Sequence, residues 1–262
     1  MDSGLIVTGL YWCNLIIRAA SILTVMVMGI LIVLSRIKPA KVLGLGYIIT
    51  SLSALSIYSS SIILHYVPEE HISMIQTAVS VFGALCSCGI SICICLYLHR
   101  NYGSRKIYYP VLIIPVVSFV LSALTVRIFN RVIGTMYSDT LIISMIQTLI
   151  SFAGSAAVGV IIIRVFYKNR HKEKIIPDMW ILRIITIFWN CVTAVYTVMS
   201  YLMIIRYSKV FNEEEVNTLA LFWIKNQDSI GLVAGIIGAV IGVIIPVYVF
   251  RRVRRLSPPE MV

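Results

Sequence analysis

Charged residues are scarce in this sequence. Only 13% of its 262 residues are Asp, Glu, Lys or Arg, whereas 59% are hydrophobic, and the mean hydropathy is +0.94. Soluble domains carry about 25% charged residues, so the composition excludes an ordinary soluble protein. The apolar runs are long enough to cross a bilayer. We therefore expect a membrane protein whose first partner is the lipid bilayer, with all 262 residues in one transmembrane domain.

Carboxylates are the scarcest charged groups, and none falls in the middle of an apolar run. Proton relays and intramembrane hydrolases need acidic groups at such positions. The sequence also lacks a His-Glu-x-x-His motif, and no Ser, His and acid gather at one depth. We therefore expect neither an enzyme nor a proton pump, and no metal or other cofactor.

Cysteine does not form a recognisable framework here. The six cysteines lie within or at the edge of apolar runs, which argues against a set of extracellular disulfides. Cys86 and Cys88 point about 200° apart on a helix, so they do not share a metal-binding face. We interpret the cysteines as small buried residues.

Seven apolar spans are present. They are predicted at 8–34, 43–66, 74–98, 108–129, 140–166, 180–205 and 222–250. Turn formers and charges separate them, at Pro39, Pro68, Gly103, Gly134, Pro177 and Glu213–Glu215. The predicted fold class is therefore an all-α membrane protein, a bundle of seven transmembrane helices.

Basic residues alternate between the two sides of this arrangement. Four clusters follow spans one, three, five and seven, and the opposite connections are mainly acidic. The positive-inside rule makes the basic side cytoplasmic, with the N-terminus outside and the C-terminus inside. This topology accounts for most of the net charge of +11, and four separate basic segments do not form a nucleic-acid surface. The sequence also contains no N-x-[ST] acceptor site for N-glycosylation, and its loops are short. We therefore expect the cytoplasmic or plasma membrane of a cell, and these two features favour a bacterium.

Polar residues recur at helical spacing in several spans. The sixth span carries Arg183, Thr186, Asn190, Thr193, Thr197 and Tyr201 on one face, and the second carries Tyr47, Ser51, Ala54, Tyr58, Ser61 and His65. Shorter stripes are Gln76, Ser80, Gly83 and Ser87 in the third span and Gln147, Ser151 and Gly154 in the fifth. Lipid does not satisfy such groups, so these faces should point inward. They either hold helices together, at about 0.6 kcal/mol per bond, or line a cavity.

Arg18 lies unusually deep for a charged residue, about 6 Å inside a core about 30 Å thick. Three interpretations are open. Its side chain reaches back to the outer headgroups, it pairs with Asp228 of the last span, or it faces a cavity that binds an anionic ligand.

Most polar residues of the spans fall in the outer half, which indicates a pocket that opens outward and is closed at its floor. The candidate ligand-binding residues are Asn14, Arg18, His65, Gln76, Gln147, Asn190, Thr197, Tyr201 and Asp228. The hypothesis is a receptor or sensor for an extracellular small molecule or peptide. It would report through a basic cytoplasmic face that binds a protein partner. That face comprises Arg100, Arg105, Lys106, Arg170, Lys172, Arg251 and Arg252.

Two alternatives remain open at this stage. Spans three and five share the string ISMIQT, which is compatible with an internal repeat, and Asn190 lies at the depth of a transport site, so a small-solute transporter is one alternative. The other is a subunit that acts only with a partner, through its basic face.

The seventh span contains a glycine ribbon, Gly231, Gly235, Gly238 and Gly242. Such small-xxx-small spacing allows two helix backbones to approach closely, so we expect a packing role.

Seven spans with an external N-terminus resemble the topology of G-protein-coupled receptors and microbial rhodopsins. His99-Arg100-Asn101-Tyr102 is similar to the receptors' acidic-Arg-Tyr element, although no acidic residue precedes Arg100. Lys225 lies at the outer end of the last span and not in its middle, where a retinal-binding lysine is required. The resemblance therefore implies the topology and no functional residues.

Overall fold

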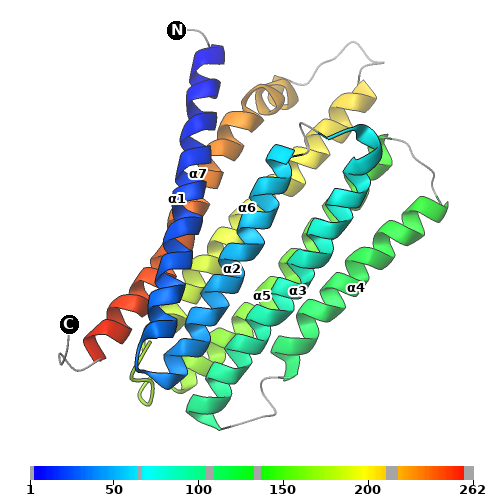
Figure 1. Cartoon of the computed structure of the whole chain (residues 1–262). Coiled ribbons are helices and arrows are strands. Elements are labelled where there is room, and N and C mark those ends of the chain that lie inside the picture. Colours follow the sequence, from blue (N-terminus) through cyan, green and yellow to red (C-terminus); the bar gives the residue numbers. More distant parts are fainter. Residues whose placement is uncertain (1–2, 64–66, 104–108, 133–136, 211–217, 257–262) are drawn as a thin grey trace.

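The computed structural model describes residues 3–63, 67–103, 109–132, 137–210 and 218–256, and they are almost entirely helical. The helices in chain order are α1 (Ser3–Leu34), α2 (Lys38–Ile63), α3 (Glu69–Tyr102), α4 (Tyr109–Val132), α5 (Tyr137–Lys168), α6 (Met179–Val210) and α7 (Thr218–Leu256). Figure 1 shows them as a bundle of long, roughly aligned rods. Each predicted span overlaps one of these helices.

Six of these helices are long and apolar enough to cross a membrane, which indicates a multi-pass membrane protein. The exception is α4, whose searched apolar stretch, Tyr109–Thr125, is shorter. Most helices extend beyond the predicted spans; α3, for example, covers Glu69–Tyr102 instead of 74–98. Backbone hydrogen bonding continues a helix into the polar boundary after the apolar pattern has ended.

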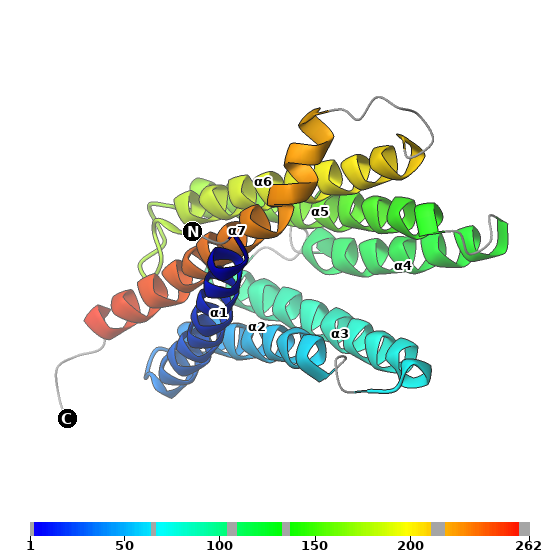
Figure 2. The same ribbon diagram turned by 90° about the horizontal axis from the view of Figure 1, so that it is seen from above.

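The helices follow one another around a ring. Each helix contacts the next in sequence, and α7 closes the ring against α1. Seen from above, α1, α2 and α3 lie on one side and α4, α5 and α6 on the other (Figure 2). The start of α1 and the finish of α7 lie at opposite ends of the bundle (Figure 1). We call these the N-terminal end and the C-terminal end.

Local sequence explains several helix boundaries. Gly103 ends α3 in the left-handed conformation (φ 71°), and its N–H donates to the carbonyl of His99 at 3.0 Å. Pro68 precedes the first residue of α3. The predicted break at Pro39 is wrong in position, because Pro39 lies in the first turn of α2, where the missing N–H has no cost. The breaks at Gly134 and Glu213–Glu215 lie outside the described residues.

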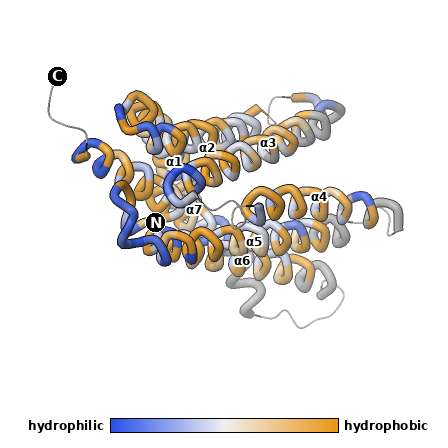
Figure 3. The backbone as a smooth tube through the Cα atoms, turned by 90° about the horizontal axis from the view of Figure 1, so that it is seen from below, coloured by the Kyte–Doolittle hydropathy of each residue, from blue (hydrophilic) through white to orange (hydrophobic). Residues whose placement is uncertain are grey.

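The best-packed core lies near the C-terminal end. It joins Ile32, Leu98, Ile162, Ile176 and Val249, which come from α1, α3, α5, the α5–α6 connection and α7. Large apolar side chains elsewhere point outward, such as Leu85, 66% exposed, and Phe188, 68% exposed. Figure 3 shows hydrophobic residues along most of each helix. An apolar exterior of this kind is what a lipid environment requires.

Gly29 of α1 and Gly44 of α2 lie where the two helix backbones approach closely. A Cβ added at Gly29 would lie 2.9 Å from the carbonyl oxygen of Gly44, and the reverse distance is 2.7 Å. Only glycine at both positions allows these two helices to pack so tightly.

Candidate ligand-binding cavities

The first cavity lies toward the N-terminal end, between α1, α2, α6 and α7, and has a volume of about 630 Å³. We call it the N-terminal cavity. Its polar lining includes five of the ligand-binding residues predicted from the sequence, together with other polar residues of the same helices. They are Tyr11, Asn14, Arg18, Tyr58, Tyr196, Thr197, Ser200, Tyr201, Gln227 and Asp228. This size falls within the usual range of small-molecule sites, about 300–1,000 Å³.

Arg18 and Asn14 both extend from α1 onto α7. A Cβ added at Gly235 would collide with the Arg18 guanidinium and would lie 2.8 Å from Asn14 Nδ2. The Asn14 side chain is buried and donates to the carbonyl of Leu232 at 3.0 Å. Gly235 therefore leaves the space in which the guanidinium lies.

The glycine ribbon packs closely against neighbouring helices, as its spacing predicts, but the groups it meets are side chains. Gly231 faces the Tyr196 hydroxyl, Gly235 faces Arg18 and Asn14, and Gly238 faces the Trp189 indole, while a Cβ at Gly242 would contact nothing within 4 Å. The neighbours are polar side chains and not a second backbone. The spacing alone does not distinguish these two uses of small residues.

Asp228 lines the same cavity as Arg18. It precedes Gly235 by seven residues, so it lies on the same face of α7 about 10 Å closer to the N-terminal end. Both side chains are exposed, and no ion pair within 4 Å joins them. The two opposite charges therefore share a cavity without neutralising each other directly.

Tyrosines hold the walls of the N-terminal cavity together. Tyr196 of α6 donates to the carbonyl of Gln227 at 2.5 Å, and Tyr58 of α2 donates to the carbonyl of Leu15 at 3.3 Å. These bonds join α6 to α7 and α2 to α1. Interhelical polar contacts here are made by Tyr and Asn.

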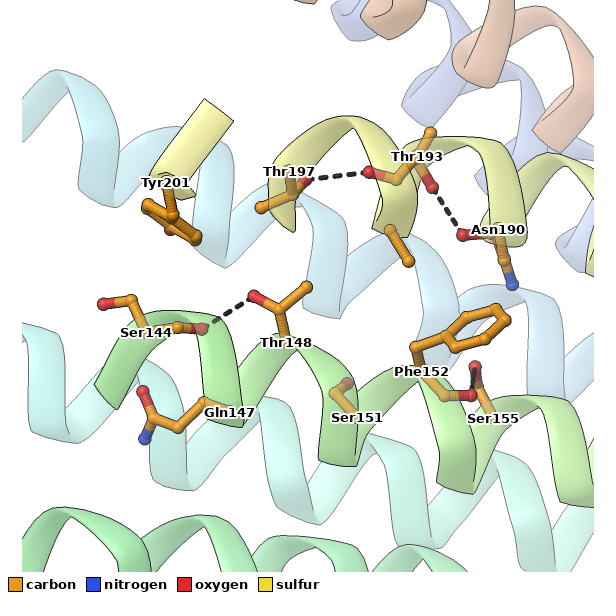
Figure 4. A pocket seen from close by; sticks show the side chains of 11 residues that line it. Ser144, Gln147, Thr148, Ser151, Phe152, Ser155, Asn190, Thr193, Thr197 and Tyr201 are labelled. Atoms are coloured by element: carbon orange, nitrogen blue, oxygen red, sulfur yellow. Dashed lines mark hydrogen bonds between the residues drawn. The ribbon is translucent and has the colours of Figure 1, made fainter. Parts of the chain in front are cut away.

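A second, polar groove of about 560 Å³ lies between α5 and α6. Figure 4 shows Ser144, Gln147, Thr148 and Ser151 on α5 opposite Asn190, Thr193, Thr197 and Tyr201 on α6. The threonines bond within their own helices; Thr197, for example, donates to the carbonyl of Thr193 at 2.8 Å. Such back-bonding satisfies the hydroxyl without a partner helix. These threonines therefore do not form hydrogen bonds between helices, which is one of the two roles that the sequence allows for the polar stripes.

A third cavity of about 470 Å³ lies toward the C-terminal end, enclosed by α1, α2, α3, α6 and α7. We call it the C-terminal cavity. Its lining is mostly aliphatic, with a few polar groups, among them Tyr47, Arg183 and Asn190. The sequence pattern predicts Arg183 only as part of the α6 stripe, because its position in a cavity depends on the tertiary arrangement.

The α6 stripe connects all three spaces. Thr197 and Tyr201 border both the N-terminal cavity and the α5–α6 groove, and Asn190 borders both the groove and the C-terminal cavity. One face of α6 thus lines open space over most of its length.

The predicted site residues are only partly brought together. Asn14, Arg18, Thr197, Tyr201 and Asp228 share the N-terminal cavity. Gln147 and Asn190 instead line the α5–α6 groove, which Thr197 and Tyr201 also border. His65 and the side chain of Gln76 lie outside the described residues.

A polar cluster at the C-terminal end was missed from sequence. Glu173, in the α5–α6 connection, is 7% exposed. Its carboxylate accepts hydrogen bonds from Tyr97 Oη at 2.9 Å, from the Tyr102 hydroxyl, and from the N–H groups of Ile175 and Ile176 at 2.9 and 3.2 Å. The available signal was a single acid within the basic run from Lys168 to Lys174.

Next to this cluster, α7 bonds to the same connection. Tyr248 donates to Asp178 Oδ2 at 3.0 Å and accepts from the Asp178 N–H at 3.3 Å. Arg252 Nη2 lies 3.5 Å from the carbonyl of Lys174. The α5–α6 connection is therefore fixed to both α3 and α7.

The predicted basic face occupies this end of the bundle. Arg100, Arg170, Lys172 and Arg251 are exposed, and Arg252 is half-buried. The Arg170 guanidinium stacks over the Tyr167 ring, 4.4 Å from its centroid. Arg105 and Lys106 lie outside the described residues. In the part of the chain that is described, no group of three His, Cys, Asp or Glu residues could hold a metal ion.

Comparison with protein families, with curated proteins and with solved structures found no match for this chain.

Proposed function

We propose that this chain is a receptor-like membrane sensor that binds a small extracellular zwitterion in the N-terminal cavity. The proposal takes all seven helices as membrane spans and the N-terminal end as the outside. The distribution of Lys and Arg supports this orientation. The N-terminal cavity then opens toward the exterior, and the basic face lies in the cytoplasm.

The supporting observation is the placement of Arg18 and Asp228 in one cavity without an ion pair between them. A guanidinium binds carboxylates through two parallel hydrogen bonds, and a carboxylate binds an ammonium group. Their separation along α7, about 10 Å, leaves room for a ligand with one group of each charge. An amino acid or a short peptide has that chemistry.

Transmission would use α7, which carries Asp228 near one end and Tyr248 near the other. Pro246 lies within this helix and has no N–H to donate to the carbonyl of Gly242, so the helix bends there at lower cost. A ligand that draws the outer part of α7 toward α1 would change the bend and the Tyr248–Asp178 contact. The exposed basic residues beside that contact would report the change to a cytoplasmic partner.

The test is ligand binding to the purified protein in phosphatidylcholine nanodiscs, with the twenty amino acids and a set of dipeptides as probes. We expect at least one zwitterion to raise the unfolding temperature. Arg18→Gln and Asp228→Asn should each lower its affinity at least tenfold. The matched control is Arg164→Gln, which changes an exposed arginine of α5 that lines none of the three cavities. Equal binding by wild type and both cavity variants would contradict the proposal.

A transporter is the second candidate, and one observation favours it. Asn190 borders both the α5–α6 groove and the C-terminal cavity, at the depth where a transported solute would cross. Asn190→Cys, with the six native cysteines replaced, would be labelled from both sides by an impermeant thiol reagent if solute passes there. A sensor without a transport path requires no labelling from the cytoplasmic side.

A further inference from the structure

Arg183 places a cation at the C-terminal cavity, separate from the N-terminal cavity. It lies four residues after the start of α6 at Met179, about 6 Å along the helix axis. Its Nε atom is buried and has no hydrogen-bond partner. A buried guanidinium nitrogen without a partner is costly, which makes Arg183 Nε an exception to the rule that buried polar groups are bonded.

The surroundings of Arg183 supply no neutralising charge. The described residues that line the C-terminal cavity include no Asp or Glu. Tyr47 of α2 lines the same cavity, and its hydroxyl is uncharged when protonated. The cavity thus presents a positive charge to whatever fills it.

Most of the remaining lining is apolar, although several hydroxyl groups and the Asn190 amide also border the cavity. Val25, Leu43, Ile90, Ile94 and Ile245 contribute to its wall, and these residues come from α1, α2, α3 and α7. A free inorganic anion would leave this surface uncovered. A ligand that covers it needs an apolar body in addition to its anionic group.

We propose that the C-terminal cavity binds a single-chain anionic amphiphile, with its carboxylate or phosphate on Arg183 and its hydrocarbon chain along the apolar wall. The volume of about 470 Å³ is in the lower half of the usual range for small-molecule sites. One medium-length chain fits this size. The site is independent of the zwitterion proposed for the N-terminal cavity.

Trp189 gives a direct reporter, because it lines the C-terminal cavity. Replacing Trp12, Trp180 and Trp223 with Phe leaves Trp189 as the only tryptophan. In phosphatidylcholine nanodiscs, bromododecanoate should quench its fluorescence saturably, and unlabelled dodecanoate should compete. Dodecyl phosphate in the same competition distinguishes a carboxylate ligand from a phosphate ligand. Bromododecanol, which lacks the charge, should quench only in proportion to its concentration in the bilayer.

Variants separate charge from shape. Arg183→Gln should weaken bromododecanoate binding at least tenfold, and Arg183→Lys should retain most of it. Arg18→Gln, in the other cavity, should leave it unchanged. One test needs only the wild-type protein and does not depend on whether the variants fold. If bromododecanol quenches Trp189 as saturably as bromododecanoate does, the proposal is overturned. Equal affinity of a folded Arg183→Gln for the acid would also overturn it.

Discussion

The guanidinium of Arg18, on α1, lies against Gly235 of α7, in space that any larger residue would occupy. This relationship joins the first and last helices of the ring and fixes a positive charge in the wall of the N-terminal cavity. One contact therefore accounts for two features that are far apart in the sequence, the deep arginine of α1 and the glycine ribbon of α7. The consequences can be tested at both residues.

Gly235→Ala should destabilise the protein by about 1–3 kcal/mol, because the added methyl displaces the Arg18 guanidinium. Adding Arg18→Ala to it should recover part of the loss, since the obstacle is then removed. Gly242→Ala is the control: its Cβ would meet nothing within 4 Å, and alanine is the better helix former. Thermal unfolding in nanodiscs measures all four proteins. Equal stability of Gly235→Ala and Gly242→Ala would show that the guanidinium does not lie there.

Arg18 and Asp228 should behave as independent residues in the unliganded protein. Because they share a cavity without an ion pair, the losses in unfolding free energy for Arg18→Ala and Asp228→Ala should add to within about 0.5 kcal/mol in the double variant. A strongly non-additive cycle, with the double variant no less stable than either single variant, would establish a direct pair and leave no free charges for a zwitterion.

Glu173→Ala should be strongly destabilising. The change removes the acceptor for Tyr97, Tyr102 and two backbone N–H groups, and unsatisfied buried donors cost about 1–3 kcal/mol each. We expect a loss of at least about 2 kcal/mol in unfolding free energy. Glu173→Gln keeps one acceptor oxygen and should lose less. Lys172→Ala, an exposed neighbour, should have almost no effect, and a Glu173→Ala protein as stable as this control would refute the buried cluster.

Tyr248→Phe should lower the unfolding free energy by about 1 kcal/mol, since it removes a single hydroxyl bonded to Asp178. Asp178→Asn tests the same contact from the other side, and the double variant should show coupling between the two. Tyr109→Phe, at a tyrosine that is 57% exposed, provides the control. If the losses of unfolding free energy for Tyr248→Phe and Asp178→Asn simply add, they do not come from a hydrogen bond between these two side chains.

Much of the fold could be predicted from the sequence, because a bilayer requires long apolar helices. The seven predicted spans each overlap a helix, and six of these helices meet the length and hydropathy needed to cross a membrane. The exact ends were less predictable. Pro39 was placed in a break, yet it lies inside the first turn of α2, where proline fits as well as it does in a loop.

The candidate sites depend on tertiary contacts that periodicity does not encode. The stripe on α6 indicated an inward face, but not that its residues divide among three spaces. Glu173 appeared as one acid in a basic loop, and only the approach of α3 makes it a buried hydrogen-bond acceptor. The same limit applies to Gly235, whose neighbour could be a backbone or a side chain until the structure is known.

Accessibility of a cysteine at position 200 tests the central claim most directly. Ser200 lines the N-terminal cavity, and Ser200→Cys would be made with the six native cysteines replaced. The account predicts labelling by an impermeant thiol reagent from outside only, with protection by a zwitterion that binds. Labelling from the cytoplasmic side, or none from the outside, would contradict an outward-opening pocket.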